Sequence, residues 1–184
     1  MGNPTVVEDA MQPTTSGRPT ADVERPPHIT MPAVVLGVGL GGLVDGIVLH
    51  QILQWHHMLT AMDAYPATTV PGLEVNTLWD GVFHTFAYVC IGVGLFWTLA
   101  RARQGVGWTW RELLGWMLVG WGGFQLVEGV IVHHILRLHH VRAGPDELAY
   151  DLGFLAIGLT LAVAGRSLAK SERQLRLSRP VDGV

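Results

Sequence analysis

Two segments of the chain carry the same histidines, glycine and acid at the same spacing. The first reads LVDGIVLHQILQWHHM from Leu43, and the second reads LVEGVIVHHILRLHHV from Leu126. The matched positions are Asp45 with Glu128, Gly46 with Gly129, His50 with His133, His56 with His139 and His57 with His140, all 83 apart. Shared apolar composition does not align such residues without a gap, so the chain contains an internal duplication.

Imidazole and carboxylate groups together suit zinc, copper and iron, which the sequence does not distinguish. A metal held by histidines from several helices has a clear physical basis, and neighbouring acids then orient those histidines or complete the ligand set. A transition-metal site is therefore the leading hypothesis. Its candidate ligands are His50, His84, His133, Asp45, Glu128, Asp80, His57 and His140.

Depth along a helix groups these residues into layers. At about 1.5 Å of rise per residue, His50 lies about 10 Å below His57, and His133 takes the same level in the second copy. His84 lies about 9 Å below the start of its own helix, so His50, His84 and His133 are expected in one layer.

A shallower and a deeper layer flank those three histidines. The shallower one is expected to hold His57, His140, Asp80 and Asp151, and the deeper one to hold Asp45 and Glu128. On an ideal α-helix, His50 and His57 share a face, whereas Asp45 and His56 lie about 140° away. His56, His57, His139 and His140 are expected near water at the boundary, where solvent exposure explains them as well as metal binding does.

The elements that position these residues are membrane helices. The 184 residues are 49% hydrophobic and 15% charged, with a mean hydropathy of +0.32. A helix needs about 20 mostly apolar residues to cross a bilayer, and four stretches qualify, near 32–57, 78–100, 112–137 and 149–169. We expect an all-α, integral membrane, multi-pass four-helix bundle over 31–170, with a disordered cytoplasmic tail at 1–30 and a basic cytoplasmic tail at 171–184.

Lys and Arg placement predicts the orientation. Most of them lie in the connection at 101–111 and after 166, whereas the loop at 59–77 has none and that at 138–148 has only Arg142. Positively charged loops stay inside, so both termini are expected in the cytoplasm and the histidines in the outer half of the bilayer.

The second and fourth stretches repeat more weakly than the first and third. Trp79 and Asp80 match Tyr150 and Asp151, but His84 falls opposite Leu155. Both copies enter from the same side, which predicts two parallel two-helix repeats around a pseudo-two-fold axis along the membrane normal. Glycine is frequent in the first and third stretches, with spacings of four residues in the first, which favours those two as central neighbours.

The segments DGIVLHQILQWHHM, LWDGVFHTFAY, EGVIVHHILRLHH and YDLGFLAIG resemble a bacterial membrane-protein family, domain of unknown function 2243. The resemblance covers residues 33 to about 170. It implies a small multi-pass inner-membrane protein and carries over no catalytic role.

Several functions stay open at this stage. The metal site would serve redox chemistry or metal handling, and the sequence does not decide whether the protein is an enzyme. Haem b held axially by His50 and His133 is an alternative, as are a proton or metal-ion transporter with Asp45 and Glu128 as relay, a non-enzymatic assembly factor, and interhelical hydrogen bonding alone. The expected partners are the lipid bilayer and a metal ion, with a homo-oligomer for transport, and no motif indicates nucleic acid.

Overall fold

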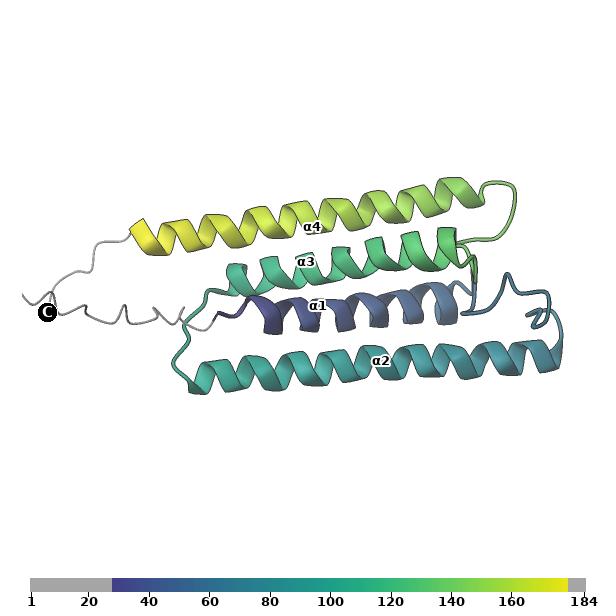
Figure 1. Cartoon of the computed structure of the whole chain (residues 1–184), viewed down its shortest axis with the longest axis horizontal. Coiled ribbons are helices and arrows are strands. Elements are labelled where there is room, and N and C mark those ends of the chain that lie inside the picture. The colour runs from purple at the N-terminus through teal and green to yellow at the C-terminus, as the bar shows by residue number, and fades with distance from the viewer. Residues whose placement is uncertain (1–27, 179–184) are drawn as a thin grey trace, which may run out of the picture.

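The computed structural model describes residues 28–178, and these form four long helices (Figure 1). The elements are α1 (Thr30–Asp45) continued by the π-helical η1 (Gly46–Ile52), α2 (Val70–Arg103), α3 (Trp110–Glu128) continued by the π-helical η2 (Gly129–Ile135), and α4 (Glu147–Ser178). Residues 28–178 contain no strand. All four helices are long and apolar enough to cross a membrane, which confirms the all-α prediction.

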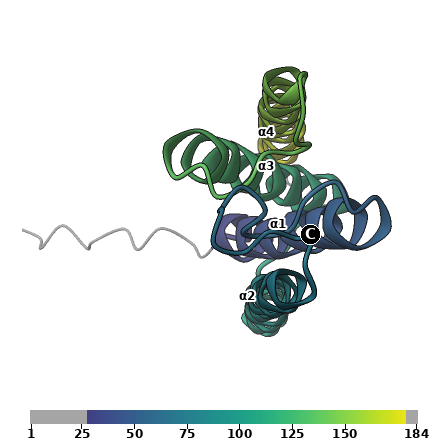
Figure 2. The same cartoon turned by 90° about the vertical axis from the view of Figure 1, so that its right-hand side faces the viewer.

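The bundle is a row in which α1 and α3 form the central pair (Figures 1 and 2). Helix α2 packs on α1 and α4 packs on α3, while within the described part of the chain α2 and α4 make no contact. The expectation that the first and third stretches are central neighbours is confirmed. Buried side chains come from the central pair, from the inner faces of the outer helices, and from the loops that follow the first and third spans.

Glycines let the two central helices approach closely. A Cβ atom added to Gly37 would clash with the backbone of Met117, and one added to Gly120 would clash with the backbone of Val34. Small residues allow this kind of contact between helices that share an apolar solvent. The α1–α3 contact thus depends on backbone proximity at two matched places.

The helix boundaries differ from the sequence estimates at three places. The first span ends at Ile52, the second begins at Val70, and α4 continues to Ser178. The early start of α2 has a local cause, because the Thr69 hydroxyl accepts a hydrogen bond from the Gly72 N–H and Pro71 lies in the first turn. The tails predicted at 1–30 and 171–184 lie outside the described residues over 1–27 and 179–184.

The π-helical ends of the first and third spans shape everything that follows. Leu53 N–H donates to Val48 O, and Leu136 N–H donates to Ile131 O, both five residues back. Gln54 and Arg137, which are matched positions, then adopt left-handed φ angles of 50° and 52°. In each repeat the backbone changes direction at this position, and the helix does not continue toward the histidine pair.

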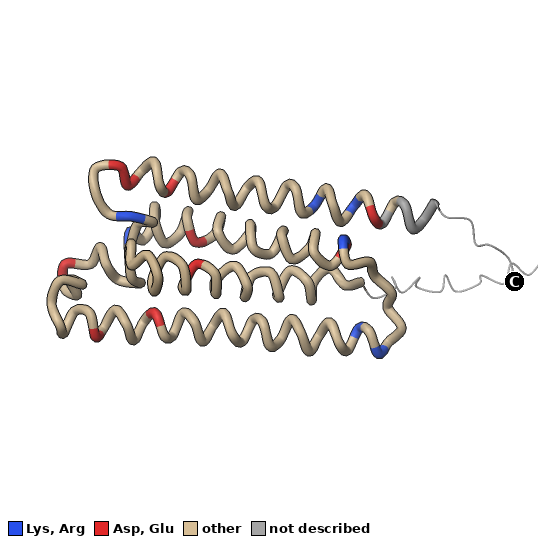
Figure 3. Tube along the Cα trace, turned by 180° about the vertical axis from the view of Figure 1, so that it is seen from behind, with Lys and Arg blue, Asp and Glu red and all other residues tan. Residues whose placement is uncertain are grey.

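Charged residues are unevenly distributed along the bundle (Figure 3). Lys and Arg gather at the end where α2 stops and α3 begins and on the neighbouring part of α4, while Arg137 and Arg142 lie near the opposite end. Most Asp and Glu residues lie toward the other end, some of them within the helices. Acidic groups among apolar helices need partners, so polar partners are expected in that half of the bundle.

The close α1–α3 contact predicts a difference between glycines. Gly120→Ala should lower the free energy of unfolding by about 1–3 kcal/mol, because the added methyl group overpacks the backbone contact with Val34. Gly81→Ala is the matched control, since a Cβ there meets nothing within 4 Å and alanine favours helix by about 1 kcal/mol. Thermal unfolding in detergent measures both. Equal melting temperatures for the two variants would contradict the packing described.

Candidate metal centre

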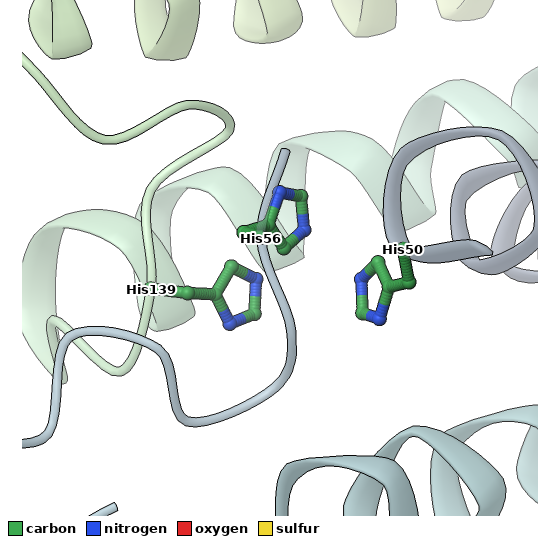
Figure 4. A group of neighbouring side chains, drawn as sticks. All are labelled: His50, His56 and His139. Carbon is green, nitrogen blue, oxygen red and sulfur yellow. The ribbon is translucent and has the colours of Figure 1, made fainter. Parts of the chain in front are cut away.

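Four imidazole rings form a buried cluster where the central helices end. The four residues are almost completely buried, with exposed fractions of 0% for His50, 3% for His56, 1% for His133 and 0% for His139. Ring centroids are 4.4 Å apart for His50 and His56, 4.5 Å for the stacked pair His56 and His139, and 4.9 Å for His139 and His133. Figure 4 shows three of these rings facing one another from two loops and one helix end.

The π-helical turn brings an acid to the cluster. Because η1 closes its hydrogen bonds over five residues, Asp45 and His50 lie one turn apart, with Asp45 Oδ2 3.4 Å from His50 Nε2. The expectation that these two residues face about 140° apart is wrong, since it assumed a regular α-helix. The matched acid, Glu128, places Oε1 3.7 Å from His139 Nε2.

His56 and His139 reach the cluster because the chain reverses at Gln54 and Arg137. His56 Nδ1 donates to Val141 O at 2.8 Å, and His139 Nδ1 donates to Met58 O at 3.1 Å. Each ring is thus fixed by the backbone of the other copy. The expectation that these histidines lie in water is wrong.

These two loop histidines are held in the neutral form. Burial, reinforced by His139 and His50, lowers the pKa of His56 to about 2. Burial also lowers the pKa of His139 to about 4, although its hydrogen bond to Met58 O opposes the shift. A neutral ring that donates through Nδ1 carries its lone pair on Nε2, which is the form that binds a metal.

Asp80 of α2 supports the first copy from outside the cluster. Its Oδ1 accepts from His50 Nδ1 at 3.0 Å and from Met58 N–H at 2.9 Å, and its Oδ2 accepts from His57 Nδ1 at 2.6 Å. This carboxylate therefore fixes the His50 ring and the returning loop together. Its geometry is that of an outer partner that orients a ligand.

Asp151 of α4 does the same in the second copy. Its Oδ1 accepts from Val141 N–H at 2.9 Å and lies 3.3 Å from His133 Nδ1, and its Oδ2 accepts from His140 Nδ1 at 2.6 Å. Of the predicted ligands, Asp80, His57 and His140 thus lie around the cluster, where His57 bonds to Asp80 and His140 bonds to Asp151. Asp151 was placed in their layer by the sequence but not among the ligands.

His84 is not brought to the other two members of the predicted three-histidine layer. Its Nδ1 donates to Asp80 O of its own helix at 2.7 Å, and its ring packs against Gly46. Leu155 occupies the matched place against Gly129. The place against the matched glycine is thus filled by His84 in one repeat and by Leu155 in the other, which is consistent with a packing role for His84.

The donor atoms form two overlapping groups within metal-binding range. His50, His56 and His139 offer atoms that all lie within 4.8 Å of one another, and so do Glu128, His133 and His139. A tetrahedral ion about 2.1 Å from each nitrogen separates its donors by about 3.4 Å, so small side-chain rotations are enough. The Nε2 atoms of all four cluster histidines are buried and have no hydrogen-bond partner.

A polar cavity of about 330 Å³ adjoins the second copy. His133, His140 and Asp151 line its inner part, and the exposed residues Arg137 and Glu147 line its rim. The cavity therefore lies beside the α3–α4 loop, and polar side chains, His133 among them, make up most of its lining.

Four apolar helices around a buried histidine and carboxylate cluster define a helical membrane protein with an internal polar site. The chain belongs to the family described as "Predicted membrane protein (DUF2243)", whose model matches residues 32–172. This match confirms the resemblance noted in the sequence. No curated protein and no solved structure matches the chain.

Loss of Asp80 should release the returning loop. In Asp80→Ala, the Met58 amide loses its acceptor, and hydrogen exchange there should rise about tenfold or more. Asp63→Ala, which removes an exposed acid from the same loop, is the matched control. Exchange is read by mass spectrometry on peptides spanning 53–69. Protection unchanged by Asp80→Ala would contradict the tether.

Proposed function

We propose that this protein binds a transition metal ion between the Nε2 atoms of His50, His56, His133 and His139. Asp45 and Glu128 lie at opposite edges of the set and complete it or balance its charge. Zinc, copper and iron all suit imidazole with carboxylate. The bound ion serves redox chemistry or metal handling.

The observation that carries the proposal is the set of four buried Nε2 atoms without a hydrogen-bond partner. Burying a polar atom unpaired costs about 1–3 kcal/mol, so four such atoms within one cluster of rings favour a shared partner. Three of the four rings donate a hydrogen bond through Nδ1 to an acceptor, and the fourth, His133, has its Nδ1 3.3 Å from Asp151. That pattern leaves Nε2 as the ligand atom on every ring.

Interhelical hydrogen bonding explains the cluster less well. Hydrogen bonds across the pseudo-two-fold axis would pair His50 with Glu128 and His133 with Asp45. Instead, His50 contacts Asp45 of its own span and Asp80, and Glu128 Oε1 approaches His139. Bonds of that kind would also use the Nε2 atoms, which among the described residues lack them.

Haem binding fits the same space less well than a bare ion does. An axial pair made by His50 and His133 needs a porphyrin between the two rings. The His56 ring lies 6.3 Å from that of His133, and the His139 ring lies 6.0 Å from that of His50. Two imidazoles therefore already fill the space that the macrocycle requires.

The proposal places the cluster in the outer half of an inner membrane, with both termini in the cytoplasm. Lys and Arg residues concentrate at the α2–α3 connection and in the last turns of α4, as cytoplasmic segments do. The loops that return His56 and His139 then face outward. Metal would reach the cluster from the outer aqueous side through the cavity beside His133.

Metal content tests the site. Wild-type protein in detergent, reloaded with zinc, copper(I) or iron(II) and then desalted, should retain metal, whereas His56→Ala combined with His139→Ala should lose at least about nine-tenths of it. His134→Ala and His84→Ala are matched controls that should retain metal, because neither ring belongs to the cluster. Elemental analysis gives the stoichiometry. Equal content in the double variant and the wild type, or no retained metal in the wild type, would end the proposal.

Cysteine labelling tests the orientation. In a Cys90→Ser background, Asp63→Cys should react with a membrane-impermeant maleimide on intact cells, since Asp63 lies in the loop assigned to the outside. Gln104→Cys, at the α2–α3 connection, should react only after the membrane is opened. Both residues are exposed, so accessibility reports the side of the membrane and not burial. The reverse pattern would invert the topology.

A further inference from the structure

Two apolar grooves lead from the helix surface to the two acids of the cluster. The Asp45 groove, of about 330 Å³, lies between α1, α3 and α4, and the Glu128 groove, of about 420 Å³, lies between α1, α2 and α3. Matched residues line both. The pairs include Asp45 with Glu128, Val44 with Val127, and Phe154 with Phe83.

The outer part of each groove faces the surroundings of the bundle. Val44 and Ile157 at the Asp45 groove are 39% and 56% exposed, and Val127 and Phe86 at the Glu128 groove are 60% and 51% exposed. These residues lie within helices long enough to cross a bilayer, so their neighbours there are acyl chains. A molecule dissolved in the membrane can enter either groove sideways.

The inner end of each groove is a single buried acid. Asp45 and Glu128 are 6% and 5% exposed, and Asp45 Oδ2 and Glu128 Oε2 lack a hydrogen-bond partner. Gln125 Oε1, which also lines the Asp45 groove, lacks one too. A carboxyl group in the lining of an otherwise apolar groove favours an occupant with a hydrogen-bond donor at its tip.

We propose that each groove binds a neutral, lipid-soluble hydroxy compound whose hydroxyl group donates to Asp45 or Glu128 and whose apolar body lies between the helices. A hydroxyl group offers the carboxyl group a hydrogen bond without bringing a second charge into the bilayer core, where charge is costly. An acyl chain without a donor fills the same volume but offers the carboxyl group no hydrogen bond. The inference rests on the proposed function in one respect only. Asp45 Oδ2 is 3.4 Å from His50 Nε2, so the hydroxyl group of the occupant would lie beside the proposed metal ion.

Photolabelling in lipid nanodiscs tests the grooves. The probe is hexadecanol with a diazirine at mid-chain, and the comparator is the alkane of equal length with the same diazirine. Labelled peptides are mapped by mass spectrometry. The alcohol should label groove residues with an apparent affinity about fivefold or more above that of the alkane, which corresponds to one hydrogen bond.

Two substitutions fill the grooves without disturbing the backbone. Gly153 and Gly123 line the Asp45 and Glu128 grooves, and a Cβ at either meets nothing within 4 Å. Gly153→Leu should abolish alcohol-specific labelling in the first groove alone, and Gly123→Leu in the second alone. Gly92→Leu, at an open position of α2 outside both grooves, should leave labelling unchanged.

Equal labelling by the alcohol and the alkane would show that ordinary acyl chains occupy the grooves, and it would overturn the proposal without any variant. Alcohol-specific labelling that survives both filling substitutions would overturn it as well. Metal content measured on the same preparations separates the two proposals. Retained metal without specific labelling contradicts the grooves alone, and specific labelling without metal contradicts the metal site alone.

Discussion

A buried imidazole must satisfy two ring nitrogens, and an apolar interior offers few partners for either. Here Asp80, Asp151 and two backbone carbonyls lie against the Nδ1 atoms of all four cluster histidines. That arrangement leaves four Nε2 atoms buried in one cluster of rings, each without a hydrogen-bond partner. The returning loops, the π-helical turns and the close contact of α1 with α3 all serve this arrangement, because each carries a ring or its acceptor to the same place.

The helical architecture could be predicted from sequence because it follows from hydropathy and length. Apolar stretches that match the bilayer thickness fixed the number and type of the elements, and small residues indicated which helices meet. The ends of the helices were harder to predict, because π-helical turns depend on local packing that composition does not show. Those turns ended the first span at Ile52 instead of near residue 57, and the difference controls where the histidine pair lies.

The candidate site could be predicted in its membership more than in its arrangement. Matched spacing identified His50, His133, Asp45 and Glu128, and these do gather at the cluster. Ideal helix geometry kept Asp45 away from His50 and left His56 and His139 near water. The signal that could have placed them was their exact match across both copies, but the reversal at Gln54 and Arg137 needs left-handed backbone at ordinary residues, which nothing in the sequence announces.

The most direct measurement of four converging imidazoles is X-ray absorption at the K-edge of the metal that the purified protein retains. We expect nitrogen and oxygen neighbours at about 2.0–2.2 Å together with the outer scattering of at least three imidazole rings. Ultraviolet and visible spectra of the same sample should lack a haem Soret band. A first shell of oxygen atoms without imidazole scattering, or a spectrum identical to that of the free ion in buffer, would contradict the site.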